Sequence, residues 1–120
     1  MLARTNSRAG FSLVEMMVVV LILAILLAIA VPQWYAARGK AHQKVCMTQL
    51  REIDGAKEFY AAEHRLPPGA PVTEANLWPV YLKGSAFPAC PAGGTYVIQP
   101  IGTAPTCSLA GAATFPHAID

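Results

Sequence analysis

The stretch Gly10–Pro32, GFSLVEMMVVVLILAILLAIAVP, decides the fold of this chain. From Phe11 to Val31 it is apolar except for one hydroxyl, Ser12, and one charge, Glu15. These 21 residues, as a helix rising 1.5 Å per residue, span roughly 31 Å, about the thickness of the hydrocarbon core of a bilayer. We therefore predict a membrane-length helix. A carboxylate within such a segment is costly, so Glu15 is expected to have a partner and a function.

The pattern changes at Pro32, which lacks a backbone donor and is expected to kink or locally melt a helix that runs through it. Helix-forming residues continue over 33–66, to about His64, as an amphipathic extension. Pro67-Pro68-Gly69 then ends the helix. The expected apolar stripe is Tyr35, Cys46, Leu50, Ile53, Ala56 and Tyr60, and the opposite charged face is Lys40, Lys44, Arg51, Asp54 and Glu58.

Residues 67–120 are expected to form a small head with little structure of its own. A short helix is predicted near Glu74–Leu82, with Thr73 as its N-cap and Pro79 as an interruption. Without the leader and the apolar run, fewer than about 90 residues remain for a soluble core. Such a core is marginal unless a cross-link or an anchoring helix supports it.

A β-hairpin is predicted near the end of the chain. Thr95–Gln99 is rich in β-branched and aromatic residues and is expected to form one strand. Thr106–Leu109 can pair back with it across a turn at Gly102–Pro105. The predicted fold class is therefore α+β, with a long kinked N-terminal helix and a small C-terminal head that contains a hairpin.

Charge and composition argue against two classes of function. The formal net charge is +2, and removing Arg4 and Arg8 leaves seven basic against seven acidic residues. No basic patch with interleaved aromatic residues is present, so no nucleic acid is predicted as a partner. His42, His64 and His117 are scattered, and no arrangement of a catalytic site follows from their spacing. We predict that the chain is not an enzyme and needs no cofactor.

The residues Gly10-Phe11-Ser12-Leu13-Val14-Glu15 and the apolar run ending at Pro32 resemble the class III signal of type IV pilins and pseudopilins. The resemblance implies removal of a leader, residues 1–10, by a prepilin peptidase that cuts between Gly10 and Phe11. It also implies N-methylation of Phe11 by the same enzyme. Residues 11–32 would then be the transmembrane and assembly helix, 33–66 its continuation and 67–120 the head.

In that family the glutamate that matches Glu15 is implied to neutralise the terminal amine of a neighbouring subunit during assembly. Physical chemistry supports such pairing, because a helix N-terminus adds roughly half a positive charge beside the new ammonium group of Phe11. Opposite charges left apart in an apolar phase each cost several kcal/mol. Glu15 can satisfy the ammonium group of its own chain or that of an adjacent chain.

Other interpretations of the N-terminal segment stay open. It can be a plain signal anchor in which the acidic residue is accidental. Ala28-Ile29-Ala30 matches the A-x-A pattern of ordinary signal peptidase, which would release residues 31–120 as a soluble protein. That second reading leaves Glu15 unexplained.

The chain has three cysteines, which with a membrane-entry segment suggests an oxidising compartment, one disulfide and one remaining thiol. Cys90 and Cys107 bracket the hairpin, in a stretch similar to the C-terminal hairpin of some short pilin-like proteins, and are the predicted disulfide. Closing this 18-residue loop stabilises by roughly 3 kcal/mol in the chain-entropy model. Two unpaired cysteines are the alternative.

No metal site is predicted. Cys46 is expected to be a small buried hydrophobe on the apolar stripe. A zinc site is disfavoured because only His117 lies near the cysteines and no C-x-x-C pair exists. Glu74 and Asp120 are the only acidic residues after residue 63, too few for a calcium site.

The function implied is that of a structural subunit of a type IV pilus, a type II secretion pseudopilus or a DNA-uptake filament. Its partners would be the prepilin peptidase, copies of itself and other pilin-like subunits, an inner-membrane assembly platform and, before assembly, the lipid bilayer. The chain is expected to cross the bacterial inner membrane once with its head in the periplasm, and then to enter a periplasmic or cell-surface filament. The alternative is a membrane-anchored or secreted small binding domain without enzymatic activity.

Overall fold

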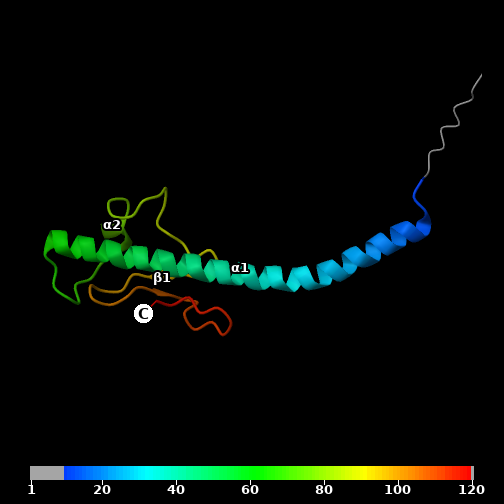
Figure 1. Cartoon of the computed structure of the whole chain (residues 1–120). Coiled ribbons are helices and arrows are strands. Elements are labelled where there is room, and N and C mark those ends of the chain that lie inside the picture. Colours follow the sequence, from blue (N-terminus) through cyan, green and yellow to red (C-terminus); the bar gives the residue numbers. More distant parts are fainter. Residues whose placement is uncertain (1–9, 120) are drawn as a thin grey trace, which may run out of the picture. The chain divides into compact units, whose positions relative to one another are not determined.

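A computed structural model describes residues 10–119 of the chain (Figure 1). The described elements are, in order, α1 (Leu13–His64), α2 (Glu74–Leu77), β1 (Tyr96–Val97) and β2 (Thr106–Cys107). The chain divides after Ala36 into two compact units, and α1 contributes to both. The α+β fold with a long apolar N-terminal helix and a C-terminal hairpin is confirmed. The predicted leader lies outside the described residues, except for Gly10.

The first unit holds the apolar part of α1. Its large hydrophobic side chains are exposed, from Phe11 at 85% to Val31 at 47%. Among residues 10–119, α1 is the one helix long and apolar enough to cross a membrane, with a mean hydropathy of 3.1 in its most apolar window. The surface of this unit therefore requires an apolar environment that the described chain does not itself supply.

α1 runs through Pro32 as one continuous helix of 52 residues. The expected local melting at this proline is absent. Helix-forming residues on both sides of Pro32 maintain the helix, although the ring removes one backbone hydrogen bond. A kink at Pro32 stays a prediction.

The second unit is built on one face of the later part of α1. The predicted apolar stripe is confirmed at Cys46, Leu50, Ile53 and Ala56, each at most 3% exposed. Tyr60 is half-buried and packs against this core. Tyr35 does not follow the prediction: it is 63% exposed, because the buried face of α1 begins at Cys46.

Two clusters of buried residues form the core of the second unit. The first contains Cys46, Leu50, Cys90 and Cys107, with Tyr96, Leu109 and Ile119 packed against it. The second contains Ile53, Ala56, Leu77 and Leu82, with Tyr60, Val72, Trp78, Tyr81, Phe87, Tyr96 and Ile98 around it. Both clusters include buried residues of α1. The loops of the head therefore pack against this helix.

The short helix of the head is less extensive than predicted. Thr73 is its N-cap, as expected, and its backbone N–H donates to Asn76 Oδ1 at 2.9 Å. The helix ends at Leu77 rather than near Leu82. A residue before proline is pushed into the β region, and Trp78, which precedes Pro79, has φ −110° and ψ 139°.

The predicted hairpin is present with shorter strands than expected. β1 and β2 pair antiparallel, with Tyr96 opposite Cys107 and Val97 opposite Thr106. Ser108 N–H adds a bond to Thr95 O at 2.9 Å. Pairing stops after Val97 because Gln99 has a positive φ of 62° and because Pro100 and Pro105 have no N–H to donate.

Hydrogen bonds attach the loops to each other and to α1. Gly69 N–H donates to Ile101 O at 2.8 Å, and Ile101 N–H donates to Ala70 O at 3.0 Å. Lys57, which is 1% exposed, donates from Nζ to Thr103 O. Gln43 Nε2 donates to Pro116 O at 2.8 Å, so the C-terminal segment, red in Figure 1, contacts α1. Burial lowers the pKa of Lys57, which the sequence pattern had not placed in the core.

The packing on α1 leads to a first prediction. Ile53→Ala removes a side chain that is fully buried, and we expect it to lower the free energy of unfolding of the head by about 2–5 kcal/mol. Near-UV circular dichroism of the full chain in mild detergent, during denaturant titration, measures this loss. Val45→Ala is the matched control, because Val45 is 45% exposed on the same helix. Equal denaturation midpoints for the two variants would contradict this description of the core.

Candidate functional site

The first turn of α1 is closed by a reciprocal pair of hydrogen bonds. Ser12 N–H donates to Glu15 Oε2 at 2.8 Å, and Glu15 N–H donates to Ser12 Oγ at 3.2 Å. This is a capping box, in which two backbone donors left free at a helix start are satisfied by side chains. The carboxylate of Glu15 is therefore turned back towards the start of the helix, next to Phe11. The resemblance and the apolar run did not reveal this cap, although the pattern Ser-x-x-Glu before an apolar run is a sequence signal for it.

The predicted cleavage position lies immediately before this cap. Gly10, Phe11 and Ser12 are outside the helix, and all three are exposed. Nothing lies within 4 Å of the place where a Cβ on Gly10 would stand. Exposed, non-helical backbone is what a peptidase requires. The alternative signal-peptidase pattern at Ala28–Ala30 is in the interior of α1 instead.

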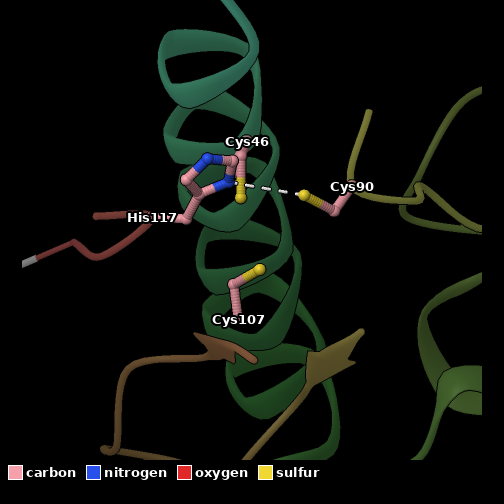
Figure 2. Close-up of side chains that lie close together, drawn as sticks. All are labelled: Cys46, Cys90, Cys107 and His117. Atoms are coloured by element: carbon pink, nitrogen blue, oxygen red, sulfur yellow. Dashed lines mark hydrogen bonds between the residues drawn. The ribbon is translucent and has the colours of Figure 1, made fainter. Parts of the chain in front are cut away.

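A second group of chemically active side chains lies in the head. Figure 2 shows Cys46, Cys90, Cys107 and His117 directed towards one another from separate parts of the chain. Their potential ligand atoms all lie within 4.8 Å of one another, and all four side chains are buried. His117 Nδ1 is 3.4 Å from Cys90 Sγ. The chain folds this way because Cys46 faces the core from α1, and Cys107 faces it from β2 opposite Tyr96.

The structure brings the predicted pair Cys90 and Cys107 close together and holds all three cysteines as free thiols. A disulfide between the two stays a prediction. Cys46 is buried, as expected of a small hydrophobe. That Cys46 and His117 join the same cluster was not predicted from the sequence. The available signal was that Cys46 lies on the buried stripe, the same side of α1 as the head.

The backbone after Cys90 favours its thiolate form. Burial by itself would raise the pKa of the Cys90 thiol. Hydrogen bonds from the backbone N–H groups of Ala92 and Gly94, together with those involving Cys46 and Cys107, outweigh this effect and hold the pKa below its usual value. Cys90 is therefore the sulfur of the cluster best prepared to carry negative charge.

Gly94 allows this close approach. A Cβ at this position would stand 2.7 Å from Cys107 Sγ and 3.2 Å from Cys90 Sγ. Any side chain at position 94 would therefore push the two sulfurs away or displace the loop. Close packing against the two sulfurs thus explains why a glycine stands at position 94.

Comparison with known proteins supports the reading of the N-terminal segment. Residues 5–31 match the model of the prokaryotic N-terminal methylation motif. The match covers the capping box of Ser12 and Glu15 and the apolar part of α1 up to Val31. The chain thus carries this motif in its N-terminal segment.

Individual relatives agree with this class. Core protein G of the type II secretion system from Aeromonas hydrophila is 31% identical over 81 residues, covering 68% of this chain and 54% of the relative. The same protein from Klebsiella michiganensis is 29% identical, covering 71% and 58%. The type IV wide pilus major component PilA4 of Thermus thermophilus is 29% identical, covering 85% of this chain and 72% of the relative.

The chain spans about half the length of the type II secretion relatives that it matches. No solved structure matches it significantly. The resemblance to type IV pilins and type II secretion pseudopilins, inferred from Gly10–Glu15 and the apolar run, is confirmed by the motif and by these relatives. This protein is a pilin-like chain with an N-terminal methylation motif.

The contact of Gly94 with the sulfurs gives a second prediction. We expect Gly94→Ala to destabilise the head by about 1–3 kcal/mol, because the new methyl group overpacks the cluster. Gly111→Ala is the matched control, since nothing lies within 4 Å of a Cβ at that position. Denaturant titration of the full chain, followed by near-UV circular dichroism, compares the two. A Gly94→Ala head as stable as the Gly111→Ala head would show that the sulfurs are less confined than described.

Proposed function

We propose that this protein is a structural, non-enzymatic subunit of a filament of the type IV pilus or type II secretion pseudopilus kind. The observation that carries the proposal is the N-terminal methylation motif, together with an apolar helix whose side chains are exposed in the single chain. A surface of this kind is stable in a bilayer or against other apolar helices, and not in water.

The chain is made as a precursor under this proposal. Prepilin peptidase cuts between Gly10 and Phe11 and methylates the new amine of Phe11. Support comes from the exposed, non-helical backbone at these residues and from the matched motif. Removal of residues 1–10 places a positive ammonium group one residue before the N-cap Ser12.

Glu15 then neutralises that ammonium group. Its carboxylate already accepts the Ser12 N–H at 2.8 Å, and so it points to the place where the new charge arises. In the membrane the carboxylate can pair with the amine of its own chain. In a filament it pairs with the amine of the preceding or following subunit, which sets the axial position of each copy, because an unpaired charge in an apolar bundle is strongly disfavoured.

The apolar part of α1 serves in two successive environments. It first holds the subunit in the inner membrane with the head in the periplasm, beside an assembly platform. It then packs against the same helix of neighbouring subunits in the core of the filament. Small side chains at Ala24, Ala28 and Ala30 allow helices to approach closely there.

The named relatives include both secretion and pilus components, and a competence protein from Halalkalibacterium halodurans is 38% identical over 63 residues. The filament is therefore proposed by class only, with a DNA-uptake filament included. The competing function is a membrane-anchored or secreted binding domain. Membrane extraction distinguishes the anchored from the secreted form, and purification of filaments distinguishes both from a pilin-like subunit.

Processing provides the first test of the proposed function. Mass spectrometry of the protein purified from its own cells is expected to find methylated Phe11 as the N-terminal residue. Replacing Gly10 by a bulky residue should leave the leader attached. An N-terminus at Met1 would indicate an uncut anchor, and one at Val31 would indicate cleavage by ordinary signal peptidase. Either result would overturn the proposal.

The charge of Glu15 provides the second test. Glu15→Gln keeps the shape of the side chain but removes its charge, and we expect incorporation into filaments to fall by at least about tenfold, since one lost ion pair in an apolar bundle exceeds 1.4 kcal/mol. The readout is the amount of subunit in sheared filaments relative to the membrane pool. Ser12→Ala is the matched control, because it weakens the helix cap and keeps the carboxylate. Equal losses in both variants would assign Glu15 to helix capping instead.

A further inference from the structure

The cluster of Cys46, Cys90, Cys107 and His117 has no part in the proposed filament function, and each of its four side chains offers one atom that can bind a metal ion. All four residues are at most 6% exposed. They come from α1, from the loop before β1, from β2 and from the C-terminal segment, so the fold rather than local sequence brings them together (Figure 2). We propose that these three sulfurs and one imidazole nitrogen bind a structural Zn²⁺ ion that fastens the loops of the head to α1.

The four ligand atoms lie close enough together to be compared with the corners of a tetrahedral site. With Zn–S bonds of about 2.3 Å and a Zn–N bond of about 2.0 Å, ligand atoms at the corners of a tetrahedron lie about 3.5–3.8 Å apart. The four atoms here are within 4.8 Å of one another, and the sulfur of Cys90 is 3.4 Å from the imidazole Nδ1 of His117. A contraction of the widest separation by about 1 Å, through side-chain rotation, brings all four atoms to bonding distance of one ion.

The chemistry of the donors selects the metal. Three thiols and one imidazole are ligands for Zn²⁺, whereas Ca²⁺ and Mg²⁺ require oxygen ligands, which the cluster does not contain. Four protein ligands leave no open position, as in structural rather than catalytic zinc sites. On binding, the three thiols release their protons to solvent and His117 binds through a neutral ring nitrogen. The loaded site therefore carries a net charge of −1.

Backbone groups are placed to stabilise that charge. The N–H groups of Ala92 and Gly94 hydrogen bond to the sulfur of Cys90. Gly94 has no side chain to block this approach, since a Cβ there would stand 3.2 Å from the same sulfur. Hydrogen bonds to ligand atoms are a regular part of metal sites, where they orient the ligands and tune their affinity.

A disulfide between Cys90 and Cys107 is the competing use of the cluster. The disulfide would use two of the sulfurs. It would give no role to the buried thiol of Cys46 or to the imidazole of His117, which lie beside it. The disulfide would also connect only the loop before β1 to β2, whereas the metal ion would connect both of them to α1 through Cys46. All four ligand groups are used in the zinc site, and none is left unexplained.

The experiment measures metal and thiols in the full chain. The protein is expressed with zinc in the medium, extracted in mild detergent with free thiols alkylated in a parallel sample, and analysed by elemental mass spectrometry. We expect about one zinc ion per chain. Replacement by Co²⁺ should give the intense visible absorption of tetrahedral cobalt, with a thiolate charge-transfer band that demonstrates sulfur ligands.

Two variants locate the ion. Cys46→Ser removes one zinc ligand but leaves both partners of the disulfide, and we expect zinc affinity to fall by more than about tenfold. His117→Ala should do the same, and His42→Ala is its matched control because His42 lies outside the cluster. Near-UV circular dichroism verifies that each variant keeps a folded head. The cobalt spectrum of the unaltered protein tests the metal site without any substitution.

Three results would overturn the site. The first is unaltered protein without stoichiometric zinc and without a cobalt–thiolate band. The second is a Cys90–Cys107 disulfide, found by peptide mapping, that persists in Cys46→Ser. The third is zinc that remains bound with full affinity in both Cys46→Ser and His117→Ala. None of these results bears on the N-terminal processing or on Glu15, so the zinc site and the filament function fail separately.

Discussion

The buried face of α1 formed by Cys46, Leu50, Ile53 and Ala56 is the surface on which the rest of the head depends. The other described elements are one helical turn and a hairpin of two-residue strands. Neither is stable alone, because short helices and isolated hairpins gain too little to offset the entropy of ordering. The loops are ordered because they cover this face, and their hydrogen bonds run to one another and to α1.

The same helix meets two different requirements along its length. In the second unit it supplies a stripe of buried residues, and most of its remaining side chains are exposed. In the first unit the large apolar side chains are about half to four-fifths exposed. At roughly 25 cal/mol per Å² of apolar surface, leaving such a segment in water is strongly unfavourable. The start of this segment is also the one place where α1 has a carboxylate among apolar residues, and the Ser12–Glu15 cap gives that carboxylate a partner before any second subunit is present.

Periodicity predicted the features that depend on a regular repeat. The positions of Cys46, Leu50, Ile53 and Ala56 follow from the helical period, and the resemblance of Gly10–Glu15 identified the class of protein. Features set by single backbone angles were less accessible. Trp78 turns into the β region before Pro79 and shortens α2, and the positive φ of Gln99 shortens β1. Lys57 of α1 lies in the core because its Nζ donates to Thr103 O, a contact between the helix and a loop that no repeat in the sequence marks.

The cysteine cluster was also not predictable from the sequence, and the reason is not a backbone angle. A cysteine on an apolar stripe looks the same whether it packs as a small hydrophobe or binds a ligand, because both require burial. The sequence pattern assigns Cys46 to packing, and a disulfide between Cys90 and Cys107 then accounts for the other two cysteines. The physical difference lies in what each bond restrains. A Cys90–Cys107 bond closes one short loop within the head, whereas a site that includes Cys46 closes the much longer path back to α1 and so removes more freedom from the unfolded chain. The loops of the head depend on packing against α1. A site that includes Cys46 ties them to this helix and so limits their detachment, which a bond between Cys90 and Cys107 alone does not.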